Sequence, residues 1–262
     1  MSGPVFSDRR EAALGVAVYS VYLAVRHVAV TRRGKGVALA NAHATVALER
    51  RLRIGIEPAI QRALVRRGRM IVLADIAYVT LNVGLTVGWL AMLHGRRDPA
   101  YHRMRTAATI ATLGAQPLHL LRPTAPPRSL DGFIDTILER GVDLDGSPLA
   151  RLYNPLAAMP SIHVAYAVVI GAAISETARS PIARAIAPAY PPLVAGIVLV
   201  TANHFVLDVI AGAMLGAGSL RLARMLSERA DGERVNAGVE RAPLGGTEPF
   251  QGTGPEVSCE RL

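Results

Sequence analysis

The sequence is short of the residue types on which several protein classes depend. It has one cysteine, Cys259, and one lysine, Lys35, among its 29 basic residues. A single cysteine excludes a disulfide framework or a cysteine-ligated metal cluster within one chain. Aromatic residues make up only 5%, and the arginines border apolar segments instead of alternating with aromatic side chains. Despite a net charge of +9, the sequence therefore does not indicate a nucleic-acid partner.

Apolar residues, in contrast, are abundant and clustered. They account for 51% of the 262 residues. The stretch 70–93 reads MIVLADIAYVTLNVGLTVGWLAML and contains one charged residue, Asp75. A helix needs about 20 apolar residues to cross the ~30 Å hydrocarbon core of a bilayer. The sequence thus predicts an integral membrane protein, and most of the arginine excess is interpreted as membrane-surface charge.

Six apolar stretches have spanning or near-spanning length. They are 12–30, 70–93, 104–121, 162–178, 184–203 and 205–226. We therefore predict an all-α integral membrane domain over 1–226 with about six transmembrane helices. The remainder, 227–262, is rich in Gly, Glu, Pro and Ser and is predicted to be a disordered tail.

The segment between the first two stretches has a composition of its own. Residues 31–69 carry ten basic residues and only two acids, Glu49 and Glu57. Over about 37–69 the pattern is helical, with the arginines grouped on one side. Two alternatives remain open: amphipathic helices that lie on the membrane surface, or a solvated helical pair that packs on the bundle.

Polar residues concentrate in three places, where apolar stretches begin or end. They are 122–128 (RPTAPPR), 160–163 (PSIH) and 203–208 (NHFVLD). If all six stretches span the membrane, connectivity alone puts these three clusters on one face. Ionisable residues at such positions are costly and mark functional sites. The sequence therefore predicts one shared site.

The residue types in these clusters suit phosphoryl transfer. Asp208 lies four residues after His204, so its carboxylate can orient that ring. His163 begins a helix whose free backbone N–H groups favour phosphate. Arginine offers a planar fork for bidentate contact with phosphate oxygens, which Arg122 and Arg128 provide.

Two side chains beside these clusters each have two open interpretations. Ser161 either caps its helix or contacts phosphate, and Asn154 either orders the preceding loop or touches the substrate. His119, one turn before Arg122, is interpreted as a helix contact.

The segments RPTAPPR, AAMPSIHVAYA and TANHFVLDVIAG resemble the three motifs of the type 2 phosphatidic acid phosphatase superfamily. Within it they resemble the inositolphosphotransferase-like branch, which includes fungal inositol phosphorylceramide synthase and its bacterial, notably actinobacterial, relatives. The resemblance covers roughly residues 45–226. It implies that His204 attacks phosphorus, that Asp208 orients His204, and that His163 protonates the leaving group. It also implies that Arg122 holds the phosphate, with Arg128 added by the PTAPPR extension, and that neither metal nor cofactor takes part.

Two departures from the common phosphatase pattern favour that branch. A lysine is usual seven residues before the first arginine, where this chain has Ala115. A Ser-Arg pair is usual seven and six residues before the last histidine, where it has Ile197 and Val198. With fewer charges left for the phosphate, Arg128 and Asn203 become candidate substitutes.

We therefore expect a lipid-phosphate phosphatase or phosphotransferase. The expected partners are a lipid phosphate, the bilayer and, for a transferase, a polyol acceptor such as inositol. One rival is a metal site built on two histidines and a carboxylate, which the nearby arginines disfavour. Another is a non-catalytic lipid-binding scaffold.

The expected location is a bacterial plasma membrane, with the N-terminus in the cytoplasm and the site facing outward. The near-membrane arginines mildly contradict this orientation, because more of them lie on the site's side than on the other.

Overall fold

The structure is a computed structural model that describes residues 6–141, 143, 146 and 153–240. Over these residues the regular elements are helices. The α-helices are α1 (Asp8–Val28), α2 (Gly34–Leu52), α3 (Glu57–Val65), α4 (Gly68–Gly95), α5 (Ala100–Leu121), α6 (Ile162–Thr177), α7 (Pro181–Ile186), α8 (Tyr190–Val200) and α9 (Val206–Glu240). Short turns of other helix types complete them at Ala29–Arg33, Pro127–Ser129, Leu138–Arg140 and Ala187–Ala189. The predicted all-α class is confirmed.

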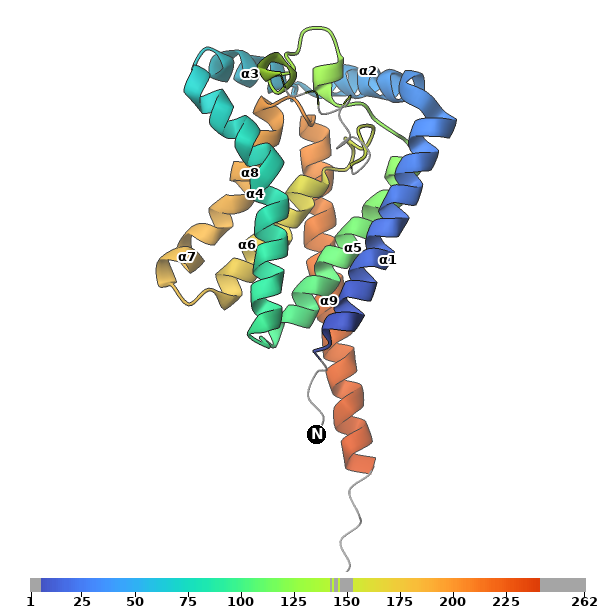
Figure 1. Cartoon of the computed structure of the whole chain (residues 1–262), viewed down its shortest axis with the longest axis vertical. Helices are drawn as coiled ribbons and strands as arrows, with labels where there is room; N and C mark the ends of the chain where they lie inside the picture. Colours follow the sequence, from blue (N-terminus) through green and yellow to red (C-terminus); the bar gives the residue numbers. More distant parts are fainter. Residues whose placement is uncertain (1–5, 142, 144–145, 147–152, 241–262) are drawn as a thin grey trace, which may run out of the picture.

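The helices form an upright bundle that is covered at one end (Figure 1). Helices α1, α4, α5, α6 and α9 run along the long axis, whereas α2 and α3 lie across the upper end. The N-terminal end of α1 and the last turns of α9 lie at the opposite end. The molecule thus has one covered end and one end from which α9 projects.

Among the described residues, fewer than six helices are long and apolar enough to cross a membrane. Three pass by length and composition: Asp8–Thr31, Pro181–Val200 and Val206–Glu233. A fourth is possible if the two halves of α4, which meet at 46°, form one span. Helix α6 is apolar but has only 16 residues, about 24 Å at 1.5 Å per residue.

Helix α5 has 22 residues and is not among these candidates. It packs against α1, α6 and α9 and buries polar side chains such as Gln116 and His119. A helix so enclosed has less need of an apolar surface. The structure therefore confirms a helical membrane protein but does not confirm six spans.

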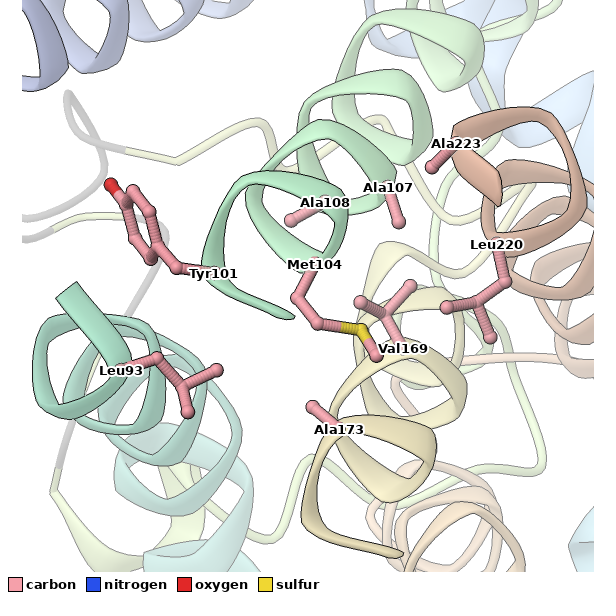
Figure 2. Packing of buried hydrophobic residues seen from close by; sticks show 9 residues of the cluster. All are labelled: Leu93, Tyr101, Met104, Ala107, Ala108, Val169, Ala173, Leu220 and Ala223. Carbon is pink, nitrogen blue, oxygen red and sulfur yellow. The ribbon is translucent and has the colours of Figure 1, made fainter. Parts of the chain in front are cut away.

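Small residues let the central helices approach closely. Figure 2 shows Met104 and Ala107 of α5 pointing toward α6 and α9 in a cluster of nine buried residues. A Cβ added at Gly212 of α9 would lie 2.3 Å from the carbonyl oxygen of Ser161, and one at Gly216 would lie 2.6 Å from that of Ala165. Such small-xxx-small spacing is typical of close helix pairs in membranes. It brings the start of α6 against α9.

Helices α2 and α3 account for the basic segment at 37–69. Helix α2 turns Ala38, Ala42, Thr45 and Glu49 inward, and this spacing of three or four residues marks one helical face. The helices pack on the end of the bundle (Figure 1), and both alternatives of the sequence analysis stay open. Their two acids face inward: Glu49 and Glu57 are 2% and 1% exposed.

Helix α9 extends beyond residue 226, where the sequence analysis placed the end of the membrane domain. It continues from 226 to Glu240, so the structure describes residues 227–240, the first part of the predicted tail, as helix. Glu, Arg and Ala, which favour helix, are frequent there. The rest of the predicted tail, 241–262, lies outside the described residues.

Candidate active site

The three polar clusters meet at the covered end of the bundle, as connectivity predicted. The backbone N–H of Ser161 donates to the carbonyl oxygen of Asp208 at 3.0 Å. The N–H of Arg128 donates to the carbonyl oxygen of Ala202 at 2.9 Å. These backbone bonds join the start of α6, the loop after α5 and the turn before α9 in one site.

His204 is held in a defined orientation by a backbone carbonyl. Its Nδ1 lies 2.8 Å from the carbonyl oxygen of Ala158. Because a carbonyl oxygen only accepts hydrogen bonds, Nδ1 carries the hydrogen in this contact. The lone pair is then on Nε2, which suits a nucleophile.

Asp208 lies beside this ring, but its shortest hydrogen bond is to the backbone of Phe205. Its Oδ2 is 3.5 Å from Nδ1 of His204 and accepts from the backbone N–H of Phe205 at 2.9 Å. Its Oδ1 is buried and has no hydrogen-bond partner among the described residues. The carboxylate is therefore near enough to stabilise charge on the ring, while Ala158 makes the shorter bond.

His163 faces His204 across the site. Their ring centroids are 5.6 Å apart. Tyr78 of α4 stacks on the ring of His163, with centroids 4.7 Å apart. Sequence reasoning missed Tyr78, because a lone tyrosine in an apolar helix has no distinctive spacing.

Arg128 is the arginine that the structure brings to the histidines. Its side chain is 6% exposed and its Nη1 lies 2.9 Å from Oδ2 of Asp135. Its Nε donates to Oδ1 of Asn203 at 3.0 Å. Asp135 was not predicted, and it fixes a guanidinium that lines the same cavity as both histidines.

Two other predicted phosphate ligands, Arg122 and Ser161, do not present free side-chain groups to this cavity. Arg122 is exposed and is not among the residues that line this cavity. Ser161 is fully buried, and its Oγ accepts from the N–H of Val164 at 3.3 Å. Ser161 therefore caps α6, the first of its two interpretations.

Asn154 and His119 complete the polar rim. Asn154 is 8% exposed, and its Oδ1 accepts from the N–H of Leu156 at 3.1 Å. Its Nδ2 is buried without a hydrogen-bond partner among the described residues and the residue lines the cavity. His119 Nε2 lies 3.2 Å from the carbonyl oxygen of Pro160, which agrees with its interpretation as a helix contact.

A cavity of about 750 Å³ leads from this rim into the bundle. Its walls are largely apolar and include Leu14, Val18, Val83 and Ala108. The far end is polar: Tyr101 donates to Oε2 of Glu11 at 2.8 Å, and Arg105 lies 3.6 Å from the same carboxylate. The cavity can accept a hydrocarbon chain next to the histidines.

Two glutamates that the sequence placed on a basic surface segment lie against the start of α9. Glu57 accepts from the N–H of Val206 and Glu49 from that of Leu207, each at 2.7 Å. Burial, together with the neighbouring Glu57 and Asp208 carboxylates, raises the pKa of Glu49 to about 8. The signal in the sequence was their isolation as the only acids among ten basic residues.

Apolar residues occupy positions where the common phosphatase pattern has lysine and arginine. Ala115 and Val198 are fully buried, and Val198 packs in a cluster with Val164 and Val194. Among the described residues, no group of three or more histidine, cysteine or acidic side chains is arranged to hold a metal ion. Arg128 lines the cavity together with both histidines.

Comparison with known proteins gives one match. The family model described as the PAP2 superfamily matches residues 43–222. The matched region starts in α2 and ends in α9, so it includes all three motifs and both buried glutamates. No curated protein and no solved structure matches the chain.

Proposed function

Because the chain belongs to the PAP2 superfamily, we propose that it is a membrane enzyme that removes or transfers phosphoryl groups of lipid phosphates through a phosphohistidine on His204. The observation that carries this proposal is the pairing of His163 and His204, 5.6 Å apart, at the head of an apolar cavity. The histidines supply the chemistry and the cavity accommodates a lipid chain.

The first step is the attack of Nε2 of His204 on phosphorus. The bond from phosphorus to the lipid oxygen breaks, and protonated His163 gives its proton to that oxygen. Arg128, held by Asp135, stabilises charge on the phosphoryl oxygens. Asp208 stabilises the positive charge that develops on the His204 ring.

The second step breaks the phosphorus–nitrogen bond. Neutral His163 takes a proton from the incoming water or alcohol, whose oxygen attacks phosphorus and frees His204. Water completes a phosphatase cycle and releases phosphate, whereas an alcohol completes a transferase cycle. Both routes use the same protein groups.

Replacement of His204 tests the mechanism. His204→Ala should abolish turnover of a short-chain lipid phosphate and prevent formation of an acid-labile phosphoenzyme from labelled substrate. His43→Ala removes an exposed histidine of α2 at the same end of the molecule and should retain both. Vanadate, a mimic of pentavalent phosphorus, should inhibit. Retained turnover in His204→Ala would refute its assignment as nucleophile.

The cavity is tested by filling it. Ala108 is 8% exposed and lines the cavity wall. Ala108→Phe would displace about two methylene groups of a bound chain, which corresponds to a roughly tenfold higher KM. Hydrolysis of p-nitrophenyl phosphate, which has no chain, should keep its KM. An unchanged lipid KM would contradict binding of the chain in this cavity.

Headgroup transfer is the second candidate. It is favoured by the burial of Ala115 and Val198, since these positions carry polar phosphate ligands in the common phosphatase pattern and not in the inositolphosphotransferase-like branch. Incubation with labelled lipid donor and free inositol distinguishes the two: a labelled inositol phosphate product indicates transfer, and free phosphate alone indicates hydrolysis.

The proposed setting is a bacterial plasma membrane, with the chain's N-terminus in the cytoplasm and the site facing outward. The accessibility of single cysteines introduced along 123–140 to a membrane-impermeant reagent tests this orientation.

A further inference from the structure

The first turn of α9 is bound by three carboxylates from three different helices. The backbone N–H groups of Phe205, Val206 and Leu207 follow His204 directly. They donate to Asp208, Glu57 and Glu49, at 2.9, 2.7 and 2.7 Å respectively. Helix N-termini leave such N–H groups without partners inside the helix, and here all three have one.

Glu49 and Glu57 come from α2 and α3, the two helices that cover the end of the bundle. A Cβ at Gly55, between these helices, would lie 3.7 Å from Oε2 of Glu57 and 4.0 Å from Oε2 of Glu49. The two carboxyl groups therefore lie near the same point beside Gly55. Their hydrogen bonds connect the covering helices to Val206 and Leu207, two and three residues after the proposed nucleophile.

The pair is buried and lacks a cation to balance it. Glu49 and Glu57 are 2% and 1% exposed, and among the described residues neither forms an ion pair with arginine, lysine or histidine. The charged groups that act on Glu49 are Glu57 on α3 and Asp208 on α9. Two carboxylates so close cannot both ionise cheaply, so the pair retains one proton at neutral pH.

The geometry points to a role for this pair in the proposed reaction, on which the inference rests. We propose that Glu49 and Glu57 are positioning residues: through their hydrogen bonds to Leu207 and Val206 they fix the first turn of α9 and thereby the ring of His204. They also occupy the amides that a phosphate group would otherwise use, which leaves the phosphate to Arg128, Asn154 and Asn203.

A consequence of this arrangement is an alkaline limit on activity. As pH rises through the pKa of Glu49, the shared proton is lost and both glutamates become negative beside Asp208. Repulsion then weakens the contact of α2 and α3 with α9 and releases the loop that holds His204. The kcat should fall at high pH, with little change in KM, because lipid binding depends on the separate cavity.

The variants Glu49→Gln and Glu57→Gln test the predicted alkaline loss of activity without removing the hydrogen-bond acceptor. A glutamine oxygen still accepts the amide of Leu207 or Val206, and a single remaining carboxylate has no like charge beside it in the pair. Each variant should keep the neutral-pH kcat within about threefold and move the alkaline fall by more than about one pH unit upward. Glu139→Gln, an exposed acid at the same end, should leave the profile unchanged.

The double variant Glu49→Ala/Glu57→Ala tests the positioning itself. Loss of both acceptors should lower kcat by about 100-fold, the scale of a misplaced catalytic group, with KM within about threefold. A purely structural role would lower the unfolding temperature of the glutamine variants and leave their pH profile like that of the wild type. That result, or a double variant with full kcat, would overturn the inference.

Hydrogen–deuterium exchange separates this inference from the proposed function. In the wild type, exchange of a peptide covering 203–208 should accelerate above about pH 8 by more than the intrinsic rate does, and in Glu49→Gln it should not. Absence of lipid-phosphate turnover in the wild type would refute the proposed function alone. Equal exchange in wild type and variant would refute the positioning pair alone.

Discussion

Nδ1 of His204 lies 2.8 Å from the carbonyl oxygen of Ala158, closer than the 3.5 Å that separates it from Oδ2 of Asp208. A backbone oxygen therefore fixes which ring nitrogen carries the hydrogen. In the Ser-His-Asp triad of serine proteases that task belongs to the aspartate. Here Asp208 is left with two tasks: it binds the amide of Phe205 and stabilises charge on the ring.

This division of tasks predicts a mild Asp208→Asn phenotype. The amide oxygen of asparagine can still accept from Phe205, and Ala158 still selects the tautomer. The kcat should fall by about 10²-fold, through loss of charge stabilisation, and not by the ~10⁴-fold that follows when the wrong tautomer forms. Steady-state kinetics beside His204→Ala measure the difference. A loss as large as that of His204→Ala would show that Asp208, and not Ala158, orients the ring.

Arg128 is predicted to contribute more to catalysis than Arg122, although the family motif implies that Arg122 is the main phosphate ligand. Arg128 is buried, bonded to Asp135 and Asn203, and lines the cavity, whereas Arg122 is exposed. Arg128→Ala should lower kcat/KM by about 10²- to 10³-fold, the scale of a lost transition-state ligand. Arg122→Ala should cost less than about tenfold. A larger loss of kcat/KM in Arg122→Ala than in Arg128→Ala would show that Arg122, the motif arginine, binds the phosphate.

Asn154 is expected to donate a hydrogen bond to the substrate, because its Nδ2 lies buried and unpartnered at the cavity. Asn154→Asp keeps the acceptor for Leu156 but replaces the donor with a negative charge. The kcat/KM should drop by at least about tenfold, since a charged group is brought against phosphate. The unfolding temperature should barely change.

Asn41→Asp is the matched control for Asn154→Asp. Its Nδ2 donates to the carbonyl oxygen of Pro123 at 2.8 Å, and Asn41 does not line the cavity. This variant should lower the unfolding temperature and leave kcat/KM near the wild-type value. If both variants behave alike, Asn154 is a structural residue only.

Close contact of α6 and α9 is predicted to depend on Gly212. Its Cβ substituent would lie 2.3 Å from the backbone oxygen of Ser161, an atom that cannot move without displacing His163. Gly212→Ala should lower the free energy of unfolding by about 1–3 kcal/mol and also reduce kcat.

Gly218→Ala is the control on the same helix, because nothing lies within 4 Å of its added Cβ. It should be neutral or stabilising by up to about 1 kcal/mol, since alanine favours helix. Thermal unfolding in detergent compares the two. Equal stability of both variants would mean that α6 and α9 can separate without cost.

The sequence could predict those features that depend on local composition and on chain connectivity. Apolar runs identified a helical membrane protein, and the positions of three polar clusters at helix ends required them to share one face. His163 and His204 are accordingly close together. Spacing along a helix also placed Asp208 beside His204.

Contacts between distant elements were beyond the reach of such reasoning. Glu49 and Glu57 bind amides more than a hundred residues away, and periodicity alone does not say what a helical face covers. Tyr78 and Asp135 reach the site from elements with no motif. The choice between Arg122 and Arg128 depends on how the loop turns after α5. One missed feature did have a signal: GAMLG, which contains Gly212 and Gly216, has the spacing of a close helix pair.

Helix α9 begins next to the site and ends at Glu240, at the opposite end of the bundle. Glu240 is thus separated from the candidate site by the length of the bundle. This makes the C-terminal side a natural place for affinity tags and compartment-sensitive fluorescent reporters. A fusion placed at that end leaves the candidate site uncovered.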